Sequence, residues 1–402
     1  MKIDKNLVRN FLTIRYNPLS NESKNLAKWN DFETKTSDSN GKLTEQFLIN
    51  SIQNSIPDNN KPISVSLSSG IDSSLCLALL RKTFPKRKIM AICGVFESGH
   101  DESIEAKKIA DYFSADFKVL HMDSIFVNMS EIISISKKPR WNTYNHLIAK
   151  EAKKRTQILV TGDGADELFG GYVFRYNKFQ QLLRTDSSWI DKAKNYLECH
   201  NRDWVPDQNF LFGKAIKFNW KEIYNYFKPY FQNKLDPISQ VMLADFNGKL
   251  LFDFIPTGKS IFNYYKIKGV PIFLEPNLIT FAQKLPLNQK YDEKNISGKL
   301  VLRKIATRLG VKHIHEKRGF SPGLLFDWQN HGKDITKSFL LNKQSQIYRK
   351  KLINFDWVQK AFEKVKFDGD IRYLNRLISI FALEIWLKIF ITHELDSTKR
   401  FN

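Results

Sequence analysis

The feature that most constrains the fold of this chain is an alternation of short apolar stretches with helical stretches from residue 61 onward. Strands that alternate with helices of about ten residues are joined by right-handed crossovers and form a parallel sheet. The sequence therefore predicts an α/β fold for this part of the chain. Strands are expected at 63–67, 89–95, 117–120 and 158–160, and helices at about 72–82, 102–113 and 144–154.

Residues 173–402 differ in character, because they are rich in Lys, Phe, Leu, Asn and Trp and few stretches favour strands. Near the end, apolar residues recur at spacings of three and four, which predicts a buried helix face. Residues 21–43 are polar and are typical of a linker. We expect an N-terminal segment with a linker at 1–60, an α/β domain at 61–178 and a helical part at 179–402. The residues of the buried face are Leu374, Leu377, Ile378, Phe381, Ile385 and Ile389.

Composition narrows the class of protein. Hydrophobic residues make up 42% and charged residues 26%, as in ordinary globular proteins. No run approaches ~18 uncharged apolar residues and the N-terminus has no apolar leader, so we expect a soluble, cytoplasmic protein without a membrane span. Cys76, Cys93 and Cys199 are scattered, which argues against a disulfide framework. The net charge of +21 favours anionic partners such as nucleotides or nucleic acids.

The first motif that carries chemistry is Leu67-Ser-Ser-Gly-Ile-Asp-Ser-Ser74, between a predicted strand and a predicted helix. Gly70 permits close approach of the backbone to a ligand, and the start of the helix presents free N–H groups to an anion. A carboxylate such as Asp72 beside phosphates implies a bridging Mg²⁺. The motif indicates a nucleotide phosphate site, although Ser and Asp also favour helix starts as caps.

The second motif is Thr161-Gly-Asp-Gly-Ala-Asp-Glu-Leu-Phe-Gly-Gly-Tyr172, directly after the predicted strand 158–160. Ligands of parallel sheets bind at the carboxyl ends of the strands, where the loops that follow two strands meet. Asp163, Asp166 and Glu167 can therefore reach the loop at Asp72. Two aspartates from separate loops make a suitable pair of oxygen ligands for Mg²⁺ on a triphosphate.

Together these motifs resemble the ATP pyrophosphatase superfamily, and within it the asparagine synthetase family. The first motif is similar to the pyrophosphatase loop, normally Ser-Gly-Gly-x-Asp-Ser, and the second resembles the family's Gly-Asp-Gly-Ala-Asp-Glu segment. Further similarities lie, in family order, at Asp101-Glu102, Gly298–Arg303 and Glu316–Pro322. The resemblance implies a parallel five-stranded sheet of the adenine nucleotide α-hydrolase type, which is Rossmann-like, followed by a mostly α-helical region.

The resemblance also implies roles for individual residues. Asp72 and Asp166 would bind Mg²⁺, Asp163 would take part in forming an acyl-adenylate, and Lys317 would neutralise the charge on departing pyrophosphate. The last role agrees with the general benefit of preorganised cations where negative charge develops. The residues that would hold ATP are Leu67, Ser68, Ser69, Gly70, Asp72, Ser73, Cys93, Thr161 and Gly162.

The chain departs from the family pattern at three places. Ser69 replaces the first glycine of the loop, and its Cβ narrows the approach to phosphate. Lys2 stands where the family's glutaminase half needs a cysteine, so we expect a chain without that domain that takes nitrogen from ammonia, an amine or a separate glutaminase. Several polar residues expected near the substrate are changed in Gly258–Glu275, which leaves the acyl substrate open.

The sequence thus predicts an ATP- and Mg²⁺-dependent ligase that activates a carboxylate, first of all the aspartate side chain, and converts it to an amide. The same chemistry on another acid, as in β-lactam synthetases or peptide-cyclising relatives, is a second interpretation. A third is a tRNA-modifying enzyme, which the net charge favours. The second motif and the segment around Lys317 belong to the asparagine synthetase branch and argue against nucleic acid as the partner. A non-catalytic binding module, suggested only by Ser69, is a minority interpretation.

Overall fold

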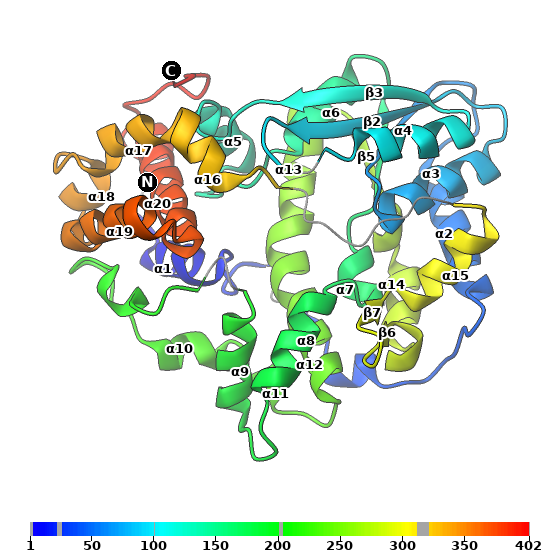
Figure 1. Ribbon diagram of the computed structural model, residues 1–402, viewed down its shortest axis with the longest axis horizontal. Coiled ribbons are helices and arrows are strands. Elements are labelled where there is room, and N and C mark those ends of the chain that lie inside the picture. The colour runs from blue at the N-terminus through cyan, green and yellow to red at the C-terminus, as the bar shows by residue number, and fades with distance from the viewer. Residues whose placement is uncertain (1–2, 22–25, 100, 201–203, 312–320, 402) are drawn as a thin grey trace.

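A parallel sheet forms one part of the molecule, as Figure 1 shows. The structure is a computed structural model that describes residues 3–21, 26–99, 101–200, 204–311 and 321–401. Among these residues, five strands pair in parallel and confirm the predicted α/β class. In spatial order the strands are β3 (Asp116–Met122), β2 (Ile89–Phe96), β1 (Ile63–Ser66), β4 (Ile158–Thr161) and β5 (Lys268–Pro271).

The centre of the sheet is its topological switch point. From β1 the chain proceeds to β2 and β3 on one side, and from β4 to β5 on the other. Val65 of β1 pairs with Ala91 of β2 and with Val160 of β4, so β1 and β4 are direct neighbours. Ligands of open parallel sheets bind where the strand order reverses in this way. The fold therefore places the loops after β1 and β4 side by side.

The strand β5 was not identified from the sequence, because it lies in the region that is otherwise helical. Its four residues contain one fully buried side chain, Val270, and it ends in Pro271. Such a short stretch carries no period-2 pattern, and proline is tolerated at the edge position that β5 occupies. Tertiary pairing with β4 decides its conformation.

Helices surround the sheet and form the rest of the chain. The predicted helices near 72–82, 102–113 and 144–154 are confirmed as α3, α4 and α6, and a short hairpin of β6 (Tyr291–Asp292) and β7 (Ser297–Gly298) precedes α15. The helices are α1 (Lys5–Ile14), α2 (Lys42–Ser55), α3 (Ile71–Thr83), α4 (Ser103–Tyr112), α5 (Met129–Ser136), α6 (His146–Lys153), α7 (Ala165–Phe169), α8 (Val173–Leu182), α9 (Trp189–Glu198), α10 (Trp220–Asn225), α11 (Lys228–Phe231), α12 (Pro237–Asp245), α13 (Ile255–Tyr265), α14 (Pro276–Gln283), α15 (Leu300–Arg308), α16 (Leu324–Asp327), α17 (Lys333–Leu340), α18 (Gln346–Arg349), α19 (Phe355–Asp368) and α20 (Ile371–Phe390).

Two large hydrophobic cores hold these elements. The first packs around the sheet and draws residues from Ile14 to Val311, and the second centres on α20, where every residue of the predicted buried face is buried. Because the first core combines all three predicted segments, their division at residues 60 and 178 stays a prediction. Within the residues that the structure describes, no helix is long and apolar enough to cross a membrane.

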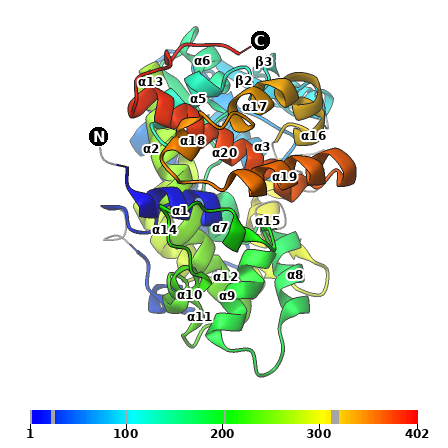
Figure 2. The same cartoon turned by 90° about the vertical axis from the view of Figure 1, so that its left-hand side faces the viewer.

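The helical part divides into two groups in space. Helices α16 to α20 gather with α1 at one end of the molecule, as Figure 1 shows. Figure 2 shows α9, α10 and α11 at the end opposite to β2 and β3. Between these groups, the central helix α13 follows a π-helical segment, Phe246–Phe254, and contacts α5 and α6. The loops after β1 and β4 thus face a wall built by the C-terminal half of the chain.

Candidate functional site

The loop after β1 is held by its own hydroxyl groups. The backbone N–H of Ser68 donates to Ser73 Oγ at 3.0 Å, and the two hydroxyls lie 2.9 Å apart. The Ser73 hydroxyl also donates to the carbonyl oxygen of Gly70 at 3.1 Å. Gly70 precedes α3 in extended backbone, so the first-turn N–H groups of that helix stand directly after the loop. This arrangement gives the loop a preformed shape beside the positive end of a helix.

Ser69 links the loop to a carboxylate that the sequence did not assign to it. Both its N–H, at 2.9 Å, and its hydroxyl, at 2.6 Å, donate to Glu102 Oε2, and Ser69 is buried. An amide of this loop is therefore already hydrogen-bonded to a charged side chain of the protein itself. Glycine at position 69 would lack the second of these hydrogen bonds.

The loop after β4 approaches the first loop closely. A Cβ on Gly162 would lie 3.0 Å from Asp72 Cβ and 3.3 Å from its carbonyl carbon, so a side chain at Gly162 would separate the loops. Thr161 Oγ1 donates to Asp163 Oδ2 at 2.8 Å. Asp166 lies in the first turn of α7, as Asp72 does in α3. The two aspartates predicted to share a ligand therefore lie at neighbouring helix starts.

A lysine joins these two aspartates. Lys299 Nζ lies 2.5 Å from Asp72 Oδ2 and 2.6 Å from Asp166 Oδ1. Its side chain is 6% exposed. Burial alone lowers the pKa of Lys299, but the attraction of Asp166 and Asp72 outweighs it and holds that pKa above its ordinary value. The ammonium group is therefore charged, and it stands where the sequence predicted a shared cation.

The backbone at Lys299 and at Gly171 allows these three side chains to meet. Lys299 has a φ of 58°, in the left-handed region, and precedes α15, while its N–H donates to the carbonyl oxygen of Phe169 in α7 at 3.0 Å. Gly171 leaves space for the side chains: a Cβ there would lie 1.9 Å from Asp166 Oδ1 and 2.4 Å from Lys299 Cε. Only glycine fits at this position of the second motif.

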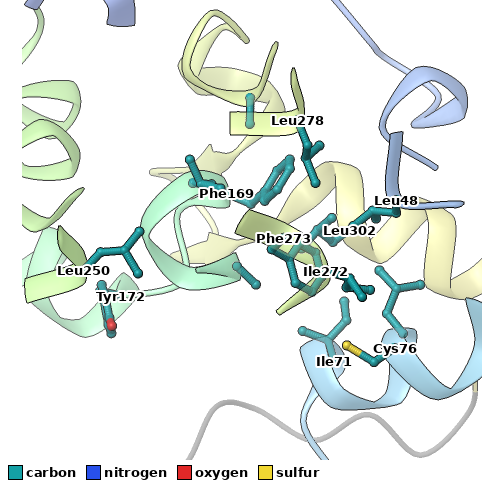
Figure 3. Close-up of a cluster of buried hydrophobic side chains, with 14 of the residues drawn as sticks. Leu48, Ile71, Cys76, Phe169, Tyr172, Leu250, Ile272, Phe273, Leu278 and Leu302 are labelled. Carbon is teal, nitrogen blue, oxygen red and sulfur yellow. The ribbon is translucent and has the colours of Figure 1, made fainter. Parts of the chain in front are cut away.

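A shared core anchors α3, α7 and α15 beneath the site. Figure 3 shows Ile71 and Cys76 of α3, Phe169 of α7 and Leu302 of α15 around Phe273, which follows β5. Phe169 and Phe273 pack edge to face, with ring centroids 6.1 Å apart. Because these side chains are close-packed, the helix starts that bear Asp72, Asp166 and Lys299 keep a constant spacing.

Asp163 is a carboxylate of the site with a raised pKa, although its side chain is exposed to the cavities. Desolvation raises its pKa, and the charges of Asp166 and Asp72 raise it further, against the hydrogen bond from Thr161. Asp163 lines both cavities of the site. A carboxyl group with a raised pKa beside a cavity is a candidate for proton transfer or for contact with a reacting group.

Two neighbouring cavities share the aspartates in their walls. The smaller, of about 270 Å³, is lined by Leu67, Thr161 and Gly162 and by apolar residues, and the larger, of about 840 Å³, contains Ser69, Lys299 and Arg303 in its wall. Asp72, Asp163 and Asp166 line both. The apolar residues of the smaller cavity include Ile148, Leu159, Phe254, Ile261 and Phe262.

The structure brings most of the predicted site residues together. Cys93 differs, because its side chain lies in the main core and burial raises its pKa to about 12, while the next residue, Gly94, lines the smaller cavity. Lys317 lies outside the described residues. Lys299 was missed as a site residue, although the segment Gly298–Arg303 resembles a family motif. In the sequence Lys299 is only a lysine just before a helix, and lysines at such positions are common and usually solvated.

Comparisons with known proteins show what this chain is similar to. The Bacillus subtilis (strain 168) protein "Asparagine synthetase [glutamine-hydrolyzing] 1" is 23% identical over 360 residues, which cover 79% of this chain and 56% of that protein. A Mycobacterium tuberculosis (strain ATCC 25618 / H37Rv) protein, "Putative asparagine synthetase [glutamine-hydrolyzing]", is 23% identical over 366 residues, which cover 82% of this chain and 55% of that protein. This chain therefore spans little more than half the length of either relative.

A solved structure shows a weaker likeness. The U34-tRNA thiolase NcsA from Methanococcus maripaludis is 15% identical and matches 80% of this chain and 78% of its own with a TM-score of 0.30, which is too low to bear on function. The family model described as "Asparagine synthase" matches residues 44–388 and so includes both loops, Lys299 and the walls of both cavities. On this match, the chain belongs to the asparagine synthase family.

Proposed function

We propose that the chain is an ATP- and Mg²⁺-dependent carbon–nitrogen ligase that activates a carboxylate as an acyl-adenylate and releases pyrophosphate. The observation that carries the proposal is the convergence of Asp72 and Asp166 on the buried cation Lys299, at the switch point of a parallel sheet. Family membership supports the same reaction class.

The chain's own groups suit a triphosphate. The loop after β1 and the start of α3 offer backbone N–H groups to phosphate oxygens, which is the general anion site of helix N-termini. Lys299 adds a buried positive charge within the same cavity. The smaller cavity, with its apolar wall, suits the adenosine part. Donors and a cation placed before the reaction stabilise charge that develops on the leaving pyrophosphate.

The residues also fit a divalent metal. Carboxylate oxygens of Asp72 and Asp166 converge on one position, now taken by Lys299 Nζ, and Mg²⁺ prefers one or two carboxylates together with phosphate oxygens. When bound, the metal would supply charge neutralisation to the phosphates. Lys299 would then pair with phosphate oxygens instead of with the aspartates.

Asp163 and Lys317 are proposed as the catalytic residues. Asp163 opens into both cavities, between the proposed positions of nucleotide and acid. Lys317 matches the family lysine that neutralises pyrophosphate, and its role rests on that resemblance. The acid is first of all the aspartate side chain, and ammonia or an amine would attack the acyl-adenylate to give the amide.

The test is exchange of radiolabelled pyrophosphate into ATP, with aspartate and a panel of other carboxylic acids. We expect acid-dependent exchange by the wild type and a loss of about 10²-fold or more in Asp72→Asn and Asp166→Asn, with the fold retained by circular dichroism. Asp368→Asn, at the exposed end of α19 and outside both cavities, is the matched control and should exchange normally. Wild-type exchange in both loop variants would refute the assignment.

A further inference from the structure

Two large apolar side chains lie exposed in the wall of the larger cavity. Phe174, at the start of α8, is 58% exposed, and Ile296, just before β7, is 45% exposed. Among the residues that the structure describes, the hydrophobic cores include neither side chain. A single exposed apolar residue is common on any protein, but these two share one cavity with the proposed reacting groups.

The two side chains belong to adjacent walls. A Cβ on Gly298 would lie 2.9 Å from Val173 Cγ1, so the strand that follows Ile296 packs against the residue that precedes Phe174. The hairpin turn is shaped by Asp292, which accepts from the N–H groups of Lys294 at 3.0 Å and Asn295 at 3.2 Å. Phe174 and Ile296 therefore lie next to two segments that pack against each other.

Ile296 adopts a backbone conformation that its side chain disfavours. Its φ is 48°, in the left-handed region, where β-branched residues are rare and glycine or asparagine is favoured. The side chain gains no compensating burial in the core. Strained residues of this kind gather at sites that bind ligands, where the strain presents a side chain to its partner.

The larger cavity is big enough for an acid larger than aspartate, and it has a positive charge in its wall. The larger cavity, of about 840 Å³, lies in the range that holds drug-sized molecules, roughly 300–1,000 Å³, and the proposed phosphate site beside Lys299 takes part of it. Free aspartate is small and has no apolar group to place beside Phe174 and Ile296. Arg303, on α15, lines the same cavity and is exposed. Its Nε donates to the carbonyl oxygen of Gly298 at 2.9 Å, and its guanidinium group has further N–H donors that an anionic ligand in this cavity could accept from.

We propose that the acid activated here carries an apolar group that binds against Phe174 and Ile296, as an N-acylated or peptide-linked aspartate does and free aspartate does not. This inference rests on the proposed function and narrows its substrate class. The carboxylate lies toward Asp163, between the proposed positions of nucleotide and acid, and the apolar group lies at the rim that Phe174 and Ile296 form.

Calorimetric titration tests the preference directly. L-Aspartate and N-phenylacetyl-L-aspartate are titrated into the full chain with Mg²⁺ and α,β-methylene-ATP, which cannot release pyrophosphate. We expect the phenylacetyl compound to bind at least about tenfold more tightly, because contact with even small apolar groups in a pocket discriminates by that much. Phe174→Ala and Ile296→Gly should each remove most of this preference.

Ile296→Gly separates recognition from folding. Glycine adopts the left-handed conformation without strain, so the variant should unfold at the wild-type temperature or above while it loses the preference. Phe367→Ala, which removes a 72% exposed phenylalanine of α19 outside both cavities, is the control and should retain the preference. Equal affinities for the two acids, no binding of either, or an unchanged preference in both rim variants would overturn the inference.

Pyrophosphate exchange with the same two acids distinguishes failure of the inference from failure of the proposed function. A binding preference without any exchange would refute the activation chemistry and leave the inference in place. Exchange at equal kcat/KM with both acids, together with equal affinities, would support the ligase and overturn the inference.

Discussion

Replacing Lys299 by methionine tests the central feature of the site. Methionine keeps most of the length and apolar volume of the lysine stem and removes the charge that Asp72 and Asp166 share. The two carboxylates then repel each other across a space that has lost its cation. We expect a less stable protein whose stability responds to Mg²⁺ in a new way.

The geometry sets the size of the effect. At separations near 2.5 Å each pair attracts by about 7 kcal/mol at an effective dielectric constant of ~20, most of which offsets the desolvation of the three groups. Removing one partner of a buried pair costs about 3–5 kcal/mol. Asp72 and Asp166 are 22% and 18% exposed, so water from the cavity solvates them in part and we expect a loss of about 3 kcal/mol.

Thermal unfolding with and without Mg²⁺ measures both effects. The loss should lower the midpoint of Lys299→Met by roughly 5 °C or more. Mg²⁺ at about ten times its Kd should restore about 1.4 kcal/mol to the variant, because the aspartates are open to it, and less to the wild type. Lys304→Met, an exposed lysine of the same helix that donates to Ser39 O, is the control. Equal midpoints for Lys299→Met and wild type, with equal responses to Mg²⁺, would refute the reasoning.

Three further predictions follow from single contacts. Glu102→Gln replaces the charged acceptor of the Ser69 N–H by a neutral one and so makes that N–H easier to give to a phosphate oxygen. Since charged hydrogen bonds exceed neutral ones by ~1 kcal/mol, we expect calorimetry to show that α,β-methylene-ATP binds about fivefold more tightly. Unchanged affinity would contradict this role. Burial lowers the pKa of Lys290 from 10.5 to about 7, only partly opposed by Asp236, so the unfolded chain binds more protons in that window and wild-type stability should rise with pH there. The free energy of unfolding from urea titrations at pH 7 and pH 9.5 should rise in the wild type but not in Lys290→Met. The same change with pH in both proteins would refute this role of Lys290. Gly171→Ala places a Cβ on Asp166 and Lys299 and should abolish pyrophosphate exchange, so normal exchange in that variant would show that the site tolerates their separation.

Local patterns account for the part of the site that sequence reasoning found. Asp72 and Asp166 follow apolar strands within short distances, and parallel strands bring their carboxyl ends to one edge of the sheet. Their proximity was therefore expected from the sequence, and the pairing of β1 with β4 in the sheet brings the two loops together. Glu102 was noted only as part of a resemblance. Its two hydrogen bonds from Ser69 depend on how α4, which begins directly after Glu102, packs beside the sheet.

The parts that were missed depend on segments remote in sequence. Lys299 reaches the aspartates because α15 packs with α3 and α7 on the core around Phe273, and no pattern near Lys299 encodes that packing. The strand β5 forms because β4 offers it an open edge. Phe174 and Ile296 each read as ordinary apolar residues until the cavity that they share is seen.

By itself, the sequence determined the fold class and the chemistry available to it, because periodicity and loop composition are properties of neighbouring residues. Only the tertiary structure decided which charge stands between the two aspartates and which side chains face the substrate cavity. The physical reason is that ion pairing and burial depend on distances through space, which packing sets between residues as far apart as Asp72 and Lys299.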